Sequence, residues 1–291
     1  MKSEYLILES APEKGYALID SGEGEKLERY GDIILSRPDP QALWPKRLSE
    51  KEWSSAKAFY GGEGKGSWEK RGDIPEHWPI EFGGLNFNIR LSTFKHTGIF
   101  PEHKPNWEWA GNMIRGAKRD IAVLNLFGYT GGATLAAAKA GASLVHVDGS
   151  KVAINWAKEN AKISGMEERP VRWILDDAMT FVRKEIKRGR RYDGIIMDPP
   201  AYGHGPEGEV WQIEKDLPEL VGLCKELMSD DPLFMLMNGY ASGYSAIAYG
   251  NMIDDAFGKG LAEIGELTIT EEEGGRRLPA GIFARYKNIG A

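Results

Sequence analysis

A carboxylate followed by two prolines and an aromatic residue is the part of this sequence best suited to chemistry. The segment Asp198-Pro199-Pro200-Ala201-Tyr202 closes the apolar run Gly194–Met197. Because proline lacks an N–H and has a fixed φ, a strand cannot continue through the pair. Asp198 is therefore expected at the carboxyl end of a buried strand, where open α/β sheets bind ligands. The rigid prolines and Tyr202 predict a flat slot for a planar group such as a nucleobase; the alternative is an ordinary turn after a strand.

A glycine-rich turn follows an earlier apolar run. It reads Asn125-Leu126-Phe127-Gly128-Tyr129-Thr130-Gly131-Gly132. Glycines at a strand-to-helix turn let a ligand approach the backbone and expose the N–H groups of the helix. The spacing matches neither the G-x-G-x-x-G of dinucleotide-binding enzymes nor a phosphate loop ending in Gly-Lys-Ser/Thr. A nicotinamide dehydrogenase is therefore a weak alternative.

Two further carboxylates follow expected strands. Asp148 ends the second strand, 20 residues after Gly128, which is the offset at which an acidic residue meets a ribose hydroxyl. Asp177, followed by Ala178, ends the third strand, where a carboxylate is placed to bind an adenine amino group. Each residue alone has a structural explanation, as a turn glycine or a helix cap. Together they predict a site for a nucleoside without a pyrophosphate.

From about residue 120 onward, the predicted elements alternate between strands and helices. Apolar runs predict strands at 121–126, 143–147, 171–175, 194–197, 233–237, 266–270 and 281–286. Helical spacing predicts helices at 130–140, 150–165, 178–188, 217–228 and 243–257. Ser150 is the expected cap of the second helix. Repeated β-α-β units predict a Rossmann-like, doubly wound α/β fold, with a mostly parallel seven-stranded sheet and an antiparallel hairpin at its edge.

The sequence before residue 93 has a different character. It is rich in Gly, Pro and Trp, and turn residues separate short apolar runs at 5–8, 16–19, 32–35 and 87–91. Six of the nine tryptophans precede residue 112. We interpret most of them as the core of a small β-rich domain, with a stacking surface for bases as the alternative.

Composition sets wide limits on function. The 291 residues are 42% hydrophobic and 27% charged, as expected for one large globular domain or a domain with a smaller appendage. A net charge of −6 argues against a protein that holds nucleic acid by bulk charge alone. The chain has no apolar run near the roughly 18 residues of a membrane helix and no signal core at its start. With a single cysteine, Cys224, these features predict a cytoplasmic protein without a membrane partner.

The histidines and the basic residues carry less information. The five histidines lack the spacing of metal ligands, so no metal site is expected. His204 lies two residues past Tyr202. A residue that contacts the substrate and an exposed loop residue without a role are equally compatible with this position. The basic run between residues 183 and 191 precedes the fourth strand, at the sheet edge opposite Asp198. A solvated helix end is favoured there over RNA contact.

The order of these motifs resembles that of class I S-adenosylmethionine-dependent methyltransferases. More narrowly, it is similar to the ribosomal large-subunit RNA methyltransferase family that modifies cytosine C5 or guanine N7. That family carries D-P-P-x-F/Y and a K-T-G-x-F segment, which here reads Lys95-His96-Thr97-Gly98-Ile99-Phe100. The resemblance covers roughly residues 90–291. It implies three regions: a β-rich domain at 1–92, a connecting segment at 93–118 that contributes to the cofactor site, and the methyltransferase domain at 119–291.

The resemblance also implies the cofactor, the substrate class and the site residues. S-adenosyl-L-methionine would be the cofactor and RNA the substrate, while the oligomeric state is not implied. The implied cofactor-binding residues are Phe100, Asn125, Phe127, Gly128, Tyr129, Thr130, Gly131, Asp148, Ser150, Asp177, Ala178 and Asp198. Among them, the turn would line the methionine part, Asp148 would bind the ribose, Asp177 would bind adenine, and Phe100 would cover the cofactor. The implied catalytic residues, facing the accepting base, are Asp198, Pro199 and Tyr202.

One departure from the family pattern concerns the nucleophile. Transfer to cytosine C5 needs a cysteine thiolate that attacks C6, and in the resembling cytosine enzymes this cysteine follows the fifth strand. Here that stretch, residues 237–242, contains no cysteine, and Cys224 falls on the apolar face of a predicted helix. We therefore expect direct transfer to a nitrogen or oxygen. Methylation of a small molecule or a protein side chain, and a cofactor-binding protein without activity, stay open.

Overall fold

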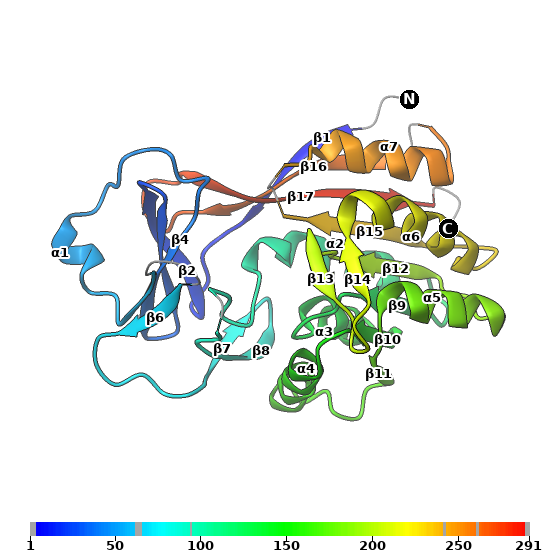
Figure 1. Ribbon diagram of the computed structural model, residues 1–291, viewed down its shortest axis with the longest axis horizontal. Helices are drawn as coiled ribbons and strands as arrows, with labels where there is room; N and C mark the ends of the chain where they lie inside the picture. The colour runs from blue at the N-terminus through cyan, green and yellow to red at the C-terminus, as the bar shows by residue number, and fades with distance from the viewer. Residues whose placement is uncertain (1–3, 62–65, 94, 241–242, 260–261, 289–291) are drawn as a thin grey trace. The chain divides into compact units, whose positions relative to one another are not determined.

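The structure is a computed structural model of the chain, and it describes residues 4–61, 66–93, 95–240, 243–259 and 262–288. The chain divides into two compact units (Figure 1). The first holds the residues up to Leu8, Pro105–Leu267 and the residues from Gly281 onward. The second holds Glu9–Lys104 and Thr268–Ala280. Each unit therefore combines segments that are far apart in the sequence.

The first unit is built on an eight-stranded sheet with the order β1-β16-β17-β15-β12-β9-β10-β11. Its parallel strands are β15 (Phe234–Gly239), β12 (Gly194–Met197), β9 (Ala122–Leu126), β10 (Ser143–Asp148) and β11 (Val171–Leu175). The strand β17 (Arg277–Lys287) runs antiparallel to β15. The expected Rossmann-like α/β class, with its mostly parallel sheet, is confirmed.

This sheet has one strand more than the seven expected, and β1 rather than a hairpin forms that edge. The strand β1 (Glu4–Ser10) lies next to β16 (Ala262–Thr270). At Gly265 of β16, a Cβ would lie 1.7 Å from the carbonyl oxygen of Leu6, so the two backbones approach closely because a glycine is there. The added strand pairs backbone groups of β16 that would otherwise form an open edge. Tertiary pairing, which the local pattern cannot show, thus places residues 4–8 in this sheet.

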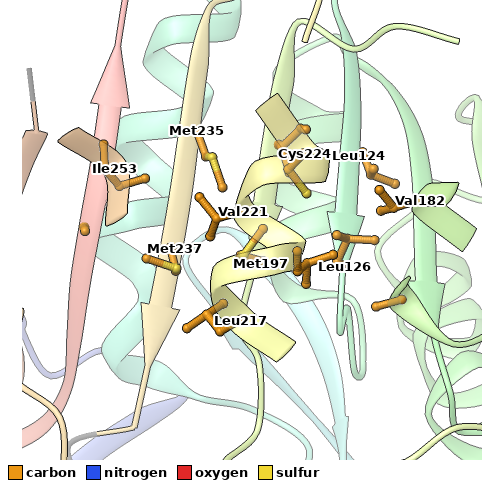
Figure 2. Packing of buried hydrophobic residues seen from close by; sticks show 14 of the residues in the cluster. Leu124, Leu126, Val182, Met197, Leu217, Val221, Cys224, Met235, Met237 and Ile253 are labelled. Carbon is orange, nitrogen blue, oxygen red and sulfur yellow. The ribbon is translucent and has the colours of Figure 1, made fainter. Parts of the chain in front are cut away.

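Helices pack on both faces of the parallel strands, because successive side chains point to opposite faces and both sets are apolar. Leu124 and Leu126 of β9 lie in a cluster with α5 (Ala178–Lys187), α6 (Ile213–Leu227) and α7 (Ala246–Phe257), part of which Figure 2 shows. Val123 lies in a second cluster with α2 (Lys104–Gly116) and α3 (Gly132–Lys139). The helix α4 (Lys151–Ile163) connects β10 to β11.

The second unit is β-rich, as predicted for this part of the chain. Its five-stranded sheet contains β2 (Tyr16–Gly22), β3 (Glu25–Tyr30), β4 (Ile33–Pro38), β5 (Ala58–Gly61) and β6 (Ser67–Lys70). A separate hairpin is formed by β7 (Trp78–Phe82) and β8 (Leu85–Ile89), and the short elements are α1 (Glu50–Trp53) and η1 (Pro101–His103). The predicted core role of the tryptophans is confirmed for Trp53 and Trp78, which are buried. Their indole N–H groups donate to Asp20 and to the carbonyl of Tyr30.

The turn between β16 and β17 completes the second unit through a polar cluster. Glu271 accepts hydrogen bonds from the backbone N–H and the hydroxyl of Ser21, at 3.0 and 2.7 Å. Arg276 donates to Asp20 at 2.8 Å and to Glu271 at 2.8 Å. These contacts explain why 268–280 belongs to this unit although it lies far from 9–104 in the sequence.

Candidate active site

The ends of four neighbouring strands bring three of the predicted site residues and one further polar residue onto one line. Leu126 pairs with Val147 on one side and with Met197 on the other, and Met197 pairs with Met237. The next residues at this edge of the sheet are, in order, Asp148, Phe127, Asp198 and Asn238. The chain reverses its direction of strand addition between β9 and β12. That switch point is where open α/β sheets bind ligands.

The turn after β9 holds two residues other than glycine in the left-handed region. Phe127 has φ 55° and Tyr129 has φ 48°, and each such residue costs about 1–3 kcal/mol unless its surroundings enforce the conformation. The N–H of Gly128 donates to the carbonyl of Val147 at 3.0 Å and ties the turn to β10. A Cβ on Gly128 would lie 2.4 Å from the ring of His146, so only glycine allows this close approach.

A buried hydrogen-bond chain supports the turn. The Nδ2 of Asn125 donates to Thr134 Oγ1 at 2.8 Å, and this hydroxyl lies 2.8 Å from Nδ1 of His146. Burial lowers the pKa of His146 to about 3, so its imidazole is neutral at physiological pH. Asn125 is 3% exposed and uses its amide nitrogen for this support. Thr134 and His146 are structural partners that the motif analysis did not identify.

Asp148 accepts hydrogen bonds from backbone N–H groups at both carboxylate oxygens. Tyr129 donates to Oδ2 and Ser150 donates to Oδ1, each at 2.8 Å. Burial raises the pKa of this carboxyl, against the effect of the two donors. Since each carboxylate oxygen has two lone pairs, the pair of oxygens retains acceptor capacity for two hydroxyl groups. The hydroxyl of Ser150 caps α4, as predicted, by accepting from the N–H of Ala153 at 3.3 Å.

Asp177 and Ala178 begin the helix that follows β11. The Oδ1 of Asp177 accepts from the N–H of Thr180 at 2.8 Å, which makes Asp177 the N-cap of α5, and Ala178 is buried in the first turn. The capping bond engages only one carboxylate oxygen, so the helix-cap and ligand interpretations of Asp177 are compatible. Thr130 is also buried, and its carbonyl accepts from Nδ2 of Asn160 at 2.9 Å.

A hairpin that the sequence analysis missed begins at the last residue of the D-P-P-A-Y segment. Its strands are β13 (Tyr202–His204) and β14 (Val210–Gln212). Tyr202 is 56% exposed, and His204 is exposed beside it with ring centroids 5.2 Å apart. At the tip, a Cβ on Gly205 would lie 3.0 Å from Cβ of Asp177, and one on Gly149 would lie 3.3 Å from the carbonyl oxygen of His204. The hairpin tip therefore lies over the ends of β10 and β11.

Asp198 lies beside a tyrosine that the sequence analysis missed. Burial, and then the charge of Asp198, raises the pKa of Tyr249 on α7. A Cβ on Gly239, at the end of β15, would lie 2.5 Å from the hydroxyl of Tyr249. This hydroxyl is thus at the ends of β12 and β15. Glycine directly after Asn238 was the only sequence signal for such a close contact.

A second buried polar chain ends at Asn238. The Nε of Arg285 donates to Glu263 at 2.8 Å, and its Nη1 donates to Oδ1 of Asn106 at 2.9 Å. Asn106 in turn donates to Oδ1 of Asn238 at 2.7 Å. This chain orients a polar side chain at the position next to Asp198, with partners contributed by β17 and α2.

Two predicted residues are not part of this line of strand-end residues. Phe100 belongs to the second unit, where its ring centroid lies 5.2 Å from that of His96. Cys224 is 0% exposed, and Figure 2 shows it on α6 among the packed side chains. Burial raises the pKa of its thiol well above the ordinary value, which disfavours the thiolate that covalent catalysis requires. Of the stretch 237–242, residues 241–242 lie outside the described residues.

The described ranges contain neither a cluster of metal ligands nor a helix that could span a membrane. Within them, no three His, Cys, Asp or Glu side chains converge as a set of metal ligands would. None of the helices described there combines the length and hydrophobicity needed to cross a membrane.

Known proteins share the fold and part of the sequence. A family model described as S-adenosylmethionine-dependent methyltransferase matches residues 56–234. The crystal structure of the SAM-dependent methyltransferase from Agrobacterium tumefaciens is 41% identical, with a TM-score of 0.94 over 99% of this chain and 95% of that chain. The crystal structure of SMU.776 in complex with SAH is 19% identical with a TM-score of 0.72, over 94% of this chain and 76% of that one. The latter similarity shows the fold.

Two curated relatives are ribosomal RNA methyltransferases. Ribosomal RNA large subunit methyltransferase K of Neisseria meningitidis serogroup B is 27% identical over 79% of this chain and 67% of its own length. Ribosomal RNA large subunit methyltransferase K/L of Shewanella frigidimarina is 28% identical over 72% of this chain. The match spans only 28% of that longer protein.

Proposed function

Because the chain belongs to the S-adenosylmethionine-dependent methyltransferase family, we propose that it methylates a base of ribosomal RNA, by direct transfer to a nitrogen or oxygen atom. One observation carries the proposal: Asp198 lies at the switch point beside the turn of Phe127, whereas the single cysteine is buried in the core. The names of the curated relatives support ribosomal RNA as the substrate. A cytoplasmic location is part of the same proposal.

The residues at the switch point fit S-adenosylmethionine. Asp148 would accept hydrogen bonds from the two ribose hydroxyls, because both of its oxygens retain acceptor capacity. Asp177 and Ala178 would contact adenine. The residues placed to line the methionine part are Phe127, Gly128, Tyr129, Thr130 and Gly131. When bound, the cofactor supplies an electrophilic methyl group on a sulfonium sulfur, and Phe100 would cover the cofactor.

The acceptor would lie against Asp198, Pro199 and Tyr202. Asp198 would accept a hydrogen bond from the N–H or O–H that is methylated and hold the proton which that atom loses. Pro199 is buried and offers a rigid wall. The enzyme's contribution is then alignment of the acceptor with the methyl group, together with charge stabilisation at the acceptor atom.

Exposed aromatic residues near the strand ends support a nucleobase as the acceptor. Tyr202 is 56% exposed and Tyr240 is 48% exposed, and they follow the neighbouring strands β12 and β15. The face of a tyrosine ring can stack on any base, so this interaction does not depend on the RNA sequence. An acidic chain with a local stacking surface suits an RNA segment that is recognised mainly by its shape and its unpaired bases.

The experiment compares ribosomal RNA from cells with and without the gene. We expect mass spectrometry of nucleoside digests to show one methylated nucleoside missing from large-subunit RNA, restored by the native gene and by Cys224→Ala but not by Asp198→Ala. An unchanged RNA profile together with a methylated protein or small molecule would redirect the proposal to another acceptor. A covalent adduct at Cys224 with fluorocytosine-containing RNA would refute direct transfer.

A further inference from the structure

We propose that Trp211 is a positioning residue that fixes two segments relative to each other. These are the acceptor-side segment, residues 198–200, and the cofactor turn, residues 127–131. Trp211 lies on β14 and is 4% exposed. Its indole contacts both Pro200, which follows Asp198 and Pro199, and Phe127, which begins the turn after β9. The proposal rests on the active site proposed above, and it deepens that site by naming what aligns its two halves.

The first half of the argument concerns the backbone torsions after Asp198. The rings of Pro199 and Pro200 fix φ at both positions. A following proline also restricts ψ of Asp198 and of Pro199. The torsion that stays free is ψ of Pro200, and this angle decides where the carbonyl of Pro200 points. The Nε1–H of Trp211 donates to that carbonyl at 2.6 Å and thereby fixes the last free torsion of the segment.

The second half concerns the turn. The ring of Trp211 packs on that of Phe127 with centroids 4.9 Å apart and an interplanar angle of 59°. Phe127 has φ 55°, a conformation that surrounding contacts must maintain. The indole packed on its ring is one such contact. The same side chain therefore restrains the residue that leads into the cofactor turn.

The hairpin is built to place the indole between these partners. Trp211 pairs across the strands with Gly203, which has no side chain to compete for the inner face of the hairpin. The backbone N–H of Ile213 donates to the carbonyl of Ala201 at 3.1 Å, which anchors the hairpin base to the same segment. Tyr202 and His204 are left on the outer, exposed face.

The ring and the N–H of Trp211 make separable predictions. Trp211→Phe keeps an aromatic ring against Phe127 but removes the donor to Pro200. We expect it to bind S-adenosylhomocysteine within about threefold of the native protein, and to transfer methyl at least about tenfold more slowly at saturating cofactor. Trp211→Leu loses both contacts, so we expect S-adenosylhomocysteine to bind at least about fivefold more weakly as well.

The test measures three quantities on the full chain. Calorimetry gives the affinity for S-adenosylhomocysteine. Hydrogen–deuterium exchange of peptides covering 196–204 and 125–132 reports order in the two segments without any substrate. Single-turnover methyl transfer uses ribosomal RNA from cells lacking the gene. Leu220→Ala, in the same core cluster on α6, is the matched control for lost packing.

Support requires a specific pattern. Trp211→Phe must raise exchange in 196–204 alone and slow transfer, Trp211→Leu must raise exchange in both segments, and Leu220→Ala must lower only the melting temperature. The proposal is overturned if Trp211→Phe matches the native protein in exchange of 196–204, or if Leu220→Ala reproduces its exchange pattern. If the native protein transfers no methyl to this RNA, the proposed function fails, while the affinity and exchange measurements still decide the role of Trp211.

Discussion

Two carboxylates, one in each unit, differ in their hydrogen-bond donors and in the direction of their pKa shifts. Glu28 in the second unit is 0% exposed and accepts from Arg37 Nε at 2.6 Å, Arg37 Nη2 at 2.7 Å and Tyr16 Oη at 2.8 Å. Asp148 in the first unit accepts only from two backbone N–H groups among the described residues. Burial would raise the pKa of Glu28, but Arg37 and Lys26 outweigh it and lower that pKa to about 2. Burial raises the pKa of Asp148, and among the residues that the structure describes no cation opposes this effect.

The contrast separates a structural carboxylate from one available to a ligand. The charge of Glu28 is compensated by Arg37, and its donors are side chains of the same unit, so we interpret Glu28 as a residue that holds the fold together. Asp148 is oriented by N–H groups that leave acceptor capacity, so a ligand that donates hydroxyl groups would complete its environment. The following predictions test this distinction and its extension to Asp198.

The largest effect is expected from Glu28→Ala. This change leaves Arg37 buried without its partner, so we expect the chain to lose about 3–5 kcal/mol of stability. Urea denaturation measures the loss. The double variant Glu28→Leu with Arg37→Met should recover most of it, because the unpaired charge is removed as well. Equal stability of Glu28→Ala and the native protein would contradict the structural role.

The stability of the protein at low pH should depend on the same carboxylate, that of Glu28. The folded pKa of Glu28 is lowered to about 2, so its contribution is present above its ordinary value near 4.5 and is lost as pH falls from there toward 2. The loss amounts to about 3 kcal/mol. Asp148 has the opposite sign, since its raised pKa favours folding at low pH. The free energy of unfolding should be measured against pH for the native protein and for Glu28→Gln. The difference between the two proteins should fall as the pH falls through this window. A difference that does not change with pH would contradict the lowered pKa of Glu28.

Asp198→Ala extends the comparison to the acceptor side. We expect turnover to fall about 100-fold, or about 2.7 kcal/mol, because the carboxylate acts on the atom that is methylated. Affinity for S-adenosylhomocysteine should change by less than about threefold. Single-turnover transfer beside equilibrium titration separates the two. Normal turnover of this variant would place the active site elsewhere.

Asp148→Ala should show the reverse pattern. We expect S-adenosylhomocysteine binding to weaken by about 1–3 kcal/mol through the loss of two charge-assisted hydrogen bonds. Asp193→Ala is the matched control, because Asp193 also accepts a backbone N–H, from Ala122 at 2.9 Å, but at the opposite end of the parallel strands. Calorimetry should find the control's affinity unchanged. A similar loss in both variants would mean that Asp148 acts through stability alone.

The smallest effect is expected at the exposed face of the hairpin. Tyr202→Ala should raise the KM for RNA about fivefold, which corresponds to about 1 kcal/mol of lost stacking. The affinity for S-adenosylhomocysteine should be unchanged. Tyr202→Phe keeps the ring and should behave as the native protein. Steady-state kinetics on RNA from cells lacking the gene provides the measurement. An equal effect of both variants would assign the role to the hydroxyl.

Much of the methyltransferase fold could be predicted because its signals are local. The parallel strands read as apolar runs, and the strands 171–175 and 194–197 were predicted with their observed bounds. Ser150 and Asp177 act as helix caps. The hairpin that begins at Tyr202 was missed because each of its strands is only three residues long. Its inner face carries a single tryptophan, so the sequence shows no alternating apolar pattern there.

The sequence by itself determined the class of sheet, the strand ends that carry Asp148 and Asp198, and the place of Cys224 on the apolar face of a helix. These follow from hydrophobic periodicity and from proline geometry, which act over a few residues. Only the tertiary structure decided that β1 completes the sheet, that 268–280 joins the second unit, and that Trp211 contacts both Pro200 and Phe127. Such contacts join residues far apart in the chain, and only the packing of whole elements brings them together.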